Sequence, residues 1–170
     1  VQVTAGEITL SDDMRAQGIV LTTSVATSSM YMGFNWLDPL VGGVEPKTAE
    51  SARKLRQAIS IAVDQEEFIS IFQNGRGVAA QGPIPPGIFG YREGAAGINR
   101  DMYDWTDGQA RRKSIAEAKR LLAEAGWPNG RDAKSGEPLV INFDTTATGV
   151  GAKARIDWLN LARFVAHLGT

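Results

Sequence analysis

The residues with the most reactive side chains are few in this chain, and their spacing does not make a catalytic centre. His167 is the only histidine and there is no cysteine, so a nucleophilic triad would depend on one imidazole near the end of an expected helix, where it suits the helix dipole. The carboxylate pairs at residues 12–13 and 66–67 are sequence neighbours, which point in different directions on a helix. They suit a helix start better than a metal ion. The residues therefore predict no catalytic residue, no metal site, no cofactor and no enzymatic activity.

The chain also offers little that would bind phosphate groups. Gly75, Gly77 and Gly82 do not form a phosphate loop, because no GK[ST] follows and the segment leaves a helix instead of entering one. Eighteen Lys and Arg residues against nineteen Asp and Glu give a formal net charge of -1. Since nucleic-acid binding depends on clustered positive charge, this balance argues against a nucleic-acid partner.

Two stretches present side chains that suit binding instead of reaction. Residues 81–87 contain three prolines and two glycines, which favours a stiff exposed loop that could dock a ligand with little loss of conformational entropy. Elsewhere, Trp36 places a large aromatic side chain at the end of an expected strand, where the chain is expected to cross to another part of the molecule through a Pro- and Gly-rich linker. Each stretch has a simpler alternative role. The proline-rich loop could be a structural segment that covers the helix pair, and the aromatic residue could be an ordinary packing residue. The candidate ligand-binding residues are Asn35, Trp36, Gln81, Ile84, Ile88 and Phe89.

The element that must position the loop is a pair of helices. Ala52, Leu55, Ile59 and Ala62 recur at spacings of three and four, which predicts a helix from about residue 48 to residue 62 with one apolar stripe. Asp64, followed three residues later by a glutamate, predicts the start of a second helix by a capping-box pattern. Glycines from residue 75 onward should end that second helix.

The remaining elements alternate helix with single strands, which predicts an α/β fold. The expected helices cover residues 12–17, with Ser11 as N-cap and Gly18 as the stop, 109–125 and 152–167. The expected strands are a strand end at 7–10, two β-rich runs at 19–25 and 30–36 that form a hairpin or neighbouring strands, and 139–143. Residues 89–107 are expected to be irregular and anchored by Tyr91, Tyr103 and Trp105.

Composition places the chain among ordinary globular proteins. With 170 residues, 43% hydrophobic and 22% charged, the chain is long enough for one sizeable core. No run reaches the length of a membrane span, and no secretory signal is visible. Because the sequence starts at Val1, we expect a processed chain or a piece of a longer one.

Four motifs together resemble a known family. They are MYMGFN at residues 30–35, LRQAISIAVD at 55–64, GRGVAAQGPIPP at 75–86 and AKRLLAEAGWPNG at 118–130. In this order and spacing they resemble the periplasmic oligopeptide- and dipeptide-binding proteins of ABC importers, although each motif alone is little more than a helix pattern. The resemblance covers most of residues 30–170. One departure is the long segment 39–52 before the first helix, where the family commonly has a shorter proline-rich approach.

The resemblance implies a two-lobed α/β binding protein that closes over a peptide or other small solute and delivers it to a membrane permease. By this analogy residues 1–35 are strands of, or leading from, the first lobe and hinge. Residues 36–170 are the helix-rich part of the second lobe, truncated at its C-terminal end. It also implies a monomeric full-length protein in the periplasm or outside the cell, associated with the membrane through its transporter. The residues themselves leave open an alternative, a stand-alone protein-interaction or enzyme-accessory α/β domain that docks a partner through residues 84–89.

Overall fold

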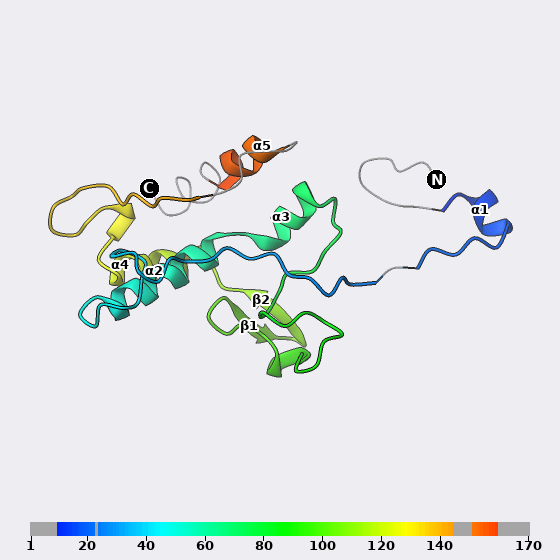
Figure 1. Ribbon diagram of the computed structural model, residues 1–170, viewed down its shortest axis with the longest axis horizontal. Helices are drawn as coiled ribbons and strands as arrows, with labels where there is room; N and C mark the ends of the chain where they lie inside the picture. The colour runs from blue at the N-terminus through cyan, green and yellow to red at the C-terminus, as the bar shows by residue number, and fades with distance from the viewer. Residues whose placement is uncertain (1–9, 23, 145–150, 160–170) are drawn as a thin grey trace. The chain divides into compact units, whose positions relative to one another are not determined.

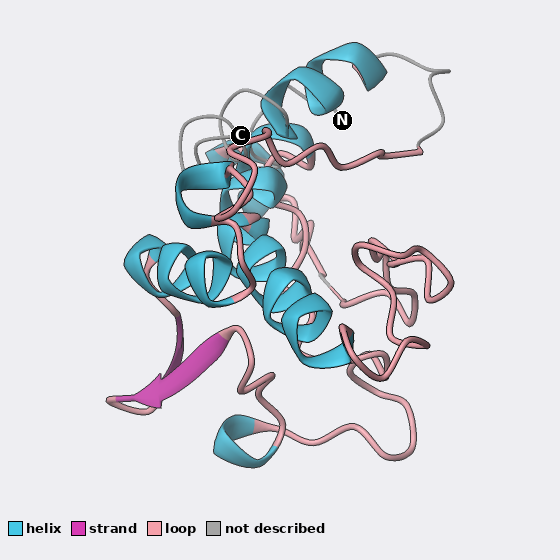
Figure 2. Cartoon of the chain, turned by 90° about the vertical axis from the view of Figure 1, so that its left-hand side faces the viewer, coloured by secondary structure: helices cyan, strands magenta, loops and turns pink. Residues whose placement is uncertain are grey.

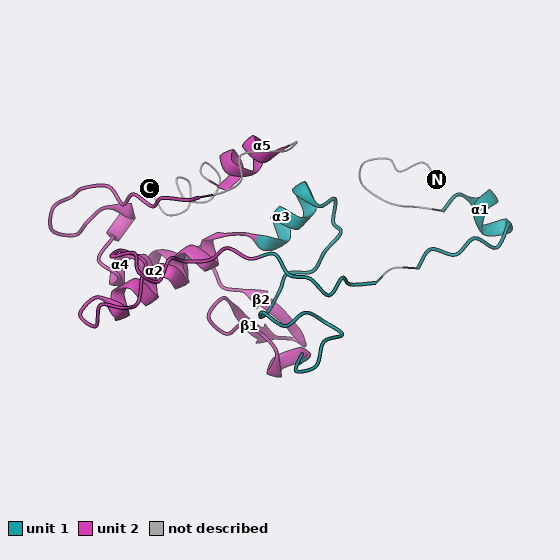
Figure 3. Ribbon diagram, in the orientation of Figure 1, with its two compact units in different colours: residues 1–30, 65–92 teal, residues 31–64, 93–170 magenta. Residues whose placement is uncertain are grey.

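The computed structural model describes residues 10–22, 24–144 and 151–159. The chain divides into two compact units, Val1–Met30 with Gln65–Arg92, and Tyr31–Asp64 with Glu93–Thr170 (Figure 3). We call them unit 1 and unit 2, and each is described by itself. The elements in chain order are α1 (Asp12–Ala16), α2 (Ala49–Ala62), α3 (Gln65–Phe72), the 3-10 turn η1 (Gly94–Ala96), β1 (Tyr103–Thr106), β2 (Gln109–Arg112), α4 (Ile115–Glu124), the 3-10 turn η2 (Pro128–Gly130) and α5 (Ala152–Asp157) (Figure 1).

The core of unit 2 is formed where α2 packs against α4 (Figure 2). All four residues of the predicted apolar stripe on α2 are buried, and the helix begins at Ala49 as the spacing predicted. From α4, Ala118, Leu121 and Leu122 enter the same cluster. The sequence therefore predicted the apolar faces of both helices correctly, because amphipathic periodicity is a local signal that tertiary packing here reinforces. It did not predict that these two helices pack on each other.

The start of α4 corrects the predicted helix at 109–125. Its N-cap is Ser114, whose hydroxyl oxygen accepts a hydrogen bond from the backbone N–H of Glu117 at 3.3 Å. Residues 109–112 instead form β2, which pairs antiparallel with β1 around the turn at Asp107 and Gly108. Both turn residues have positive φ, at 53° and 75°, as a type I′ hairpin turn requires. The irregular segment expected at 89–107 therefore ends in a strand.

The other expected strands are absent from the described residues. Residues 19–22, 24–25, 30–36 and 139–143 belong to no strand, nor does Leu10, while residues 7–9 lie outside the described part. Met32, Phe34 and Ile141 nevertheless pack against the core of unit 2. A strand forms only when another strand satisfies its backbone groups, and no such partner lies along these runs within the described residues. The prediction of strands from the β-rich composition was therefore wrong for these described residues.

Shorter helices follow their predicted starts. Ser11 caps α1, with its hydroxyl oxygen accepting from the backbone N–H of Met14 at 3.2 Å. In unit 1, α3 follows Asp64 directly and ends before Asn74 and Gly75, both with positive φ. The last helix, α5, begins at Ala152 as predicted. The rest of that prediction, residues 160–167 with His167, lies outside the described residues.

Asp64 is the last residue of the first segment of unit 2 and lies two residues after the end of α2. Its carboxylate pairs with the Arg112 guanidinium from β2, and both side chains are about one-fifth exposed. The same guanidinium donates to the backbone carbonyl of Ile61 at 2.9 Å. Arg112 therefore joins the hairpin to the C-terminus of α2, where a cation also suits the helix dipole.

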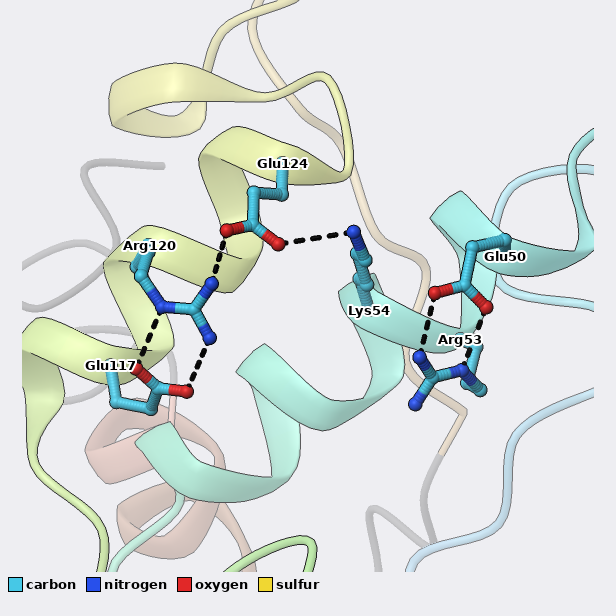
Figure 4. A network of polar contacts seen from close by, with 6 residues as sticks. All are labelled: Glu50, Arg53, Lys54, Glu117, Arg120 and Glu124. Carbon is cyan, nitrogen blue, oxygen red and sulfur yellow. Dashed lines mark hydrogen bonds and ion pairs between the residues drawn. The ribbon is translucent and has the colours of Figure 1, made fainter.

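A chain of ion pairs connects the outer faces of α2 and α4 (Figure 4). The carboxylate of Glu124 contacts the ammonium of Lys54 at 3.0 Å and the guanidinium of Arg120. Arg120 also holds Glu117 through two hydrogen bonds, at 2.8 and 2.6 Å. The hydrogen bond from Lys54, followed by that from Arg120, lowers the pKa of Glu124 below its ordinary value of 4.5.

This network predicts a pH-dependent stability. Because the folded-state pKa of Glu124 is lowered, its contribution is complete above the unfolded value and is lost as the pH falls through the folded value. Glu124→Gln should therefore melt at a lower temperature than the parent protein at about pH 7, and this gap should narrow as the pH falls below the ordinary glutamate pKa toward the lowered one. Thermal melts followed by circular dichroism across this range test it. Glu45→Gln, at an exposed position, is the control and should show no such gap; a Glu124→Gln gap that persists undiminished in acid would contradict the prediction.

Candidate ligand-binding site

The loop at residues 81–89 in unit 1 exposes apolar side chains, as expected. Phe89 is fully exposed, at 102%, and Ile84 and Ile88 are 40% and 44% exposed. The loop contains no helix or strand, and its backbone folds through a turn in which the N–H of Tyr91 donates to the carbonyl of Ile88 at 3.0 Å. Gln81 is half-buried, and its side-chain amide donates to the carbonyl of Ala79 at 3.5 Å. This segment is a short apolar surface with a polar residue at its start.

Asn35 and Trp36 begin a tight corner in unit 2. The side-chain oxygen of Asn35 accepts from the N–H of Leu37 at 3.0 Å, which fixes the start of the turn. The carbonyl of Trp36 accepts from the N–H of Gly43 at 3.1 Å, so the chain returns to its starting point after seven residues. The Trp36 side chain is 55% exposed. It therefore keeps a free surface although its backbone is fixed.

Arg56 of α2 holds this corner. One terminal nitrogen, Nη1, donates to the carbonyls of Val41 at 2.7 Å and Gly42 at 3.0 Å. The guanidinium carbon lies 4.8 Å from the centre of the Trp36 ring, in a cation–π contact. A Cβ on Gly43 would lie 2.2 Å from that ring. Trp36 is thus a packing residue of the corner, which was the plainer of its two predicted roles, and its exposed part can still contact a ligand.

A pocket of about 230 Å³ lies on the polar side of α2 in unit 2. Sequence reasoning did not identify it, although one signal was present: four of its residues follow α2 at helical spacing, opposite the apolar stripe. The other four come from the segment before α2 and from the segment before β1. The lining residues are Phe34, Arg53, Arg56, Gln57, Ser60, Asn99, Asp101 and Met102.

The six predicted ligand-binding residues fall into two groups. Asn35 and Trp36 belong to unit 2, whereas the four loop residues belong to unit 1. Within each group the residues lie close together, and Trp36 and the pocket share Arg56. That these six residues bind a ligand stays a prediction.

Comparison with known proteins identifies the class of this chain. It is 38% identical over 77 residues to heme-binding protein A of Haemophilus influenzae and 36% identical over 77 residues to the dipeptide-binding protein of Escherichia coli, each match covering 45% of this chain and 12% of the relative. It is 28% identical over 139 residues to the oligopeptide-binding protein AppA of Bacillus subtilis, covering 81% of this chain and 22% of the relative. No solved structure is detectably similar to the chain.

These matches cover between 12% and 22% of the length of the curated relatives. Among the described residues, no helix has both the length and the apolar character needed to cross a bilayer. Residues 2–157 match the middle region of the bacterial extracellular solute-binding proteins of family 5, which is nearly the whole chain. The chain therefore belongs to the family 5 bacterial extracellular solute-binding proteins, in agreement with the resemblance carried by its four motifs.

Proposed function

We propose that this chain is part of a protein that captures a peptide or related small solute outside the cytoplasm and delivers it to an ABC permease. The family match over residues 2–157 is the observation that carries the proposal. Relatives named for dipeptide, oligopeptide and heme binding support capture of a solute over chemical conversion. They differ in their named ligand, so the fold does not select one.

The proposed mechanism is hinge closure of two lobes over the solute. A ligand that contacts both lobes stabilises the closed state by the contacts it makes only there. Residues 36–170 would contribute a wall of the second lobe, and residues 1–35 would lead from the first lobe and hinge. The exposed apolar loop at 81–89 would face the solute, because its side chains are already extended toward solvent and need little ordering.

Binding measurements test this proposal. The natural gene product that contains these 170 residues should bind a peptide or a related solute with micromolar affinity, worth about -8 kcal/mol, when screened by thermal shift and measured by calorimetry. If one wall supplies half of that energy, the 170 residues alone should bind the same solute only in the millimolar range, at about -4 kcal/mol. Micromolar binding by the 170 residues alone would contradict the one-wall mechanism. Capture of a protein partner, with no solute bound, would instead support the alternative interaction domain.

The most exposed loop residue gives a specific prediction. Phe89→Ser in the natural gene product should weaken solute binding by about tenfold, because burying an aromatic side chain against a ligand contributes a kilocalorie or more. Thermal stability should change little, since this side chain is fully exposed. Calorimetry with the solute found in the screen measures the effect.

Val78→Ser is the matched control for Phe89→Ser. Val78 is apolar, 57% exposed and in the same unit, but it lies outside the loop at 81–89. Its replacement should leave solute affinity unchanged. Equal affinities for the Phe89→Ser variant and the parent protein would remove this loop from the site.

A further inference from the structure

Arg56 carries a positive charge that no carboxylate balances within the described residues. Among the other half-buried cations of the described residues, Lys54, Arg112 and Lys113 have the carboxylate partners Glu124, Asp64 and Asp104, respectively. Arg155 in α5 is also half-buried and forms no ion pair with a described residue, but it does not line the pocket. The contacts of Arg56 are instead two backbone carbonyls and an aromatic ring. A partly buried charge without an opposite charge is unfavourable, so this guanidinium attracts an anion.

The geometry of Arg56 favours a planar anion. Its Nη1 is used by the carbonyls of Val41 and Gly42, and among the described residues no hydrogen bond uses Nε or Nη2. These two nitrogens form the edge of the guanidinium that can donate two parallel hydrogen bonds to a carboxylate. Because the corner and the Trp36 ring already fix the side chain, little further ordering is needed for binding.

The pocket beside Arg56 suits a small ligand with an apolar body. Its volume of about 230 Å³ is below the usual range for drug-sized ligands and is close to the size of one amino-acid residue. Phe34 is half-buried and Met102 is 7% exposed, and they give the pocket apolar walls. Ser60 places a hydroxyl group in the lining.

The other charged residues in the lining, Arg53 and Asp101, already have hydrogen-bond partners. Arg53 is held by two hydrogen bonds to Glu50, at 2.9 and 2.6 Å. One carboxylate oxygen of Asp101 accepts from the side-chain amide of Gln57 at 2.8 Å. Arg56 is therefore the arginine of the lining whose Nε and Nη2 donate no hydrogen bond within the described residues.

We propose that this pocket binds a carboxylate carried on a small apolar body, with Nε and Nη2 of Arg56 donating to its two oxygens. The site lies wholly within unit 2, so the inference goes beyond solute capture by hinge closure and does not depend on it. A free short-chain acid and the C-terminal residue of a peptide both present this chemistry.

Paired ligands test the proposal on the 170-residue chain. N-acetyl-leucine and its primary amide share an apolar body and differ in the carboxylate, and isovalerate represents a free acid. By calorimetry or NMR titration, N-acetyl-leucine should bind in the millimolar range and at least about tenfold more tightly than the amide, as charge-assisted hydrogen bonds predict. If isovalerate binds as tightly as N-acetyl-leucine, the site is assigned to free acids. If isovalerate binds more weakly than N-acetyl-leucine, the site is assigned to peptide termini. Equal binding of N-acetyl-leucine and its amide, or no saturable binding of either acid, would overturn the proposal.

Variants locate the site. Arg56→Gln should abolish the preference for the acid over the amide, whereas Arg111→Gln, which also removes one arginine charge from unit 2 at an exposed position, should preserve it. Because Arg56 also holds the corner, Ser60→Leu provides a second variant that fills the pocket and leaves the arginine in place. It should weaken N-acetyl-leucine binding by about tenfold or more. Unchanged binding in Ser60→Leu, or an acid preference that survives Arg56→Gln, would place the ligand elsewhere.

Discussion

Replacing Leu122 by alanine is expected to lower the free energy of unfolding by about 2–5 kcal/mol. Leu122 is 1% exposed and lies in α4 at the contact with α2, in one cluster with Leu55 and Ile61. The substitution removes three buried carbon atoms and leaves a space that two packed helices can only partly fill. Urea denaturation followed by circular dichroism measures the loss.

The control for Leu122→Ala is Leu37→Ala. Leu37 is 80% exposed, so its replacement should change the free energy of unfolding by no more than about 0.5 kcal/mol. The two variants make the same chemical change and differ in burial. A loss below about 1 kcal/mol for Leu122→Ala would mean that α4 does not pack on α2 as described.

The helices could be predicted from the sequence because their signals are local. The stripe on α2, the serine cap of α1 and the glycines after α3 each act within a few residues. These signals give the same result whatever lies elsewhere in the chain. The prediction of a second helix directly after Asp64 succeeded for the same reason.

The hairpin was missed although its signal was in the sequence. Asp107–Gly108 is one of the dipeptides that favour a two-residue hairpin turn, and Tyr103 and Trp105 precede it at strand spacing. The arginines and the lysine that follow the turn are compatible with a helix, and the helix was predicted to begin at residue 109 instead of 115. Pairing of β2 with β1, and the contact of Arg112 with Asp64, decide the structure there.

The binding residues were only partly predictable. A proline-rich segment predicts an exposed loop by its own backbone chemistry, and residues 81–89 form one. The pocket depends on side chains from α2 meeting side chains that lie about forty residues later, as Gln57 meets Asp101. No pattern within one segment reports such a contact. The β-rich runs at 19–25 and 139–143 failed as strands for a related reason, because a strand depends on a partner that its own sequence does not contain.

Gly42→Ala is expected to destabilise unit 2 by about 3 kcal/mol, near the upper end of overpacking substitutions. Gly42 is buried, and a Cβ there would lie 2.2 Å from the carbonyl oxygen of Asp38 and 2.3 Å from that of Trp36. Both neighbours are backbone atoms, so the corner must open to accept the methyl group. Its carbonyl also accepts from Arg56, so the substitution should loosen the guanidinium that contacts the Trp36 ring.

Gly33→Ala is the matched control for this prediction. A Cβ on Gly33 would approach nothing closer than a Tyr31 ring carbon at 3.9 Å, and its φ is not in the left-handed region. It should therefore change the free energy of unfolding by less than about 0.5 kcal/mol. Urea denaturation gives the energies, and the indole N–H signal of Trp36 in a nitrogen–proton NMR spectrum reports the corner directly. That signal should shift in Gly42→Ala and stay in place in Gly33→Ala; an unshifted signal in Gly42→Ala would mean that the corner does not hold Trp36, and the fixed guanidinium proposed for carboxylate binding would lose its support.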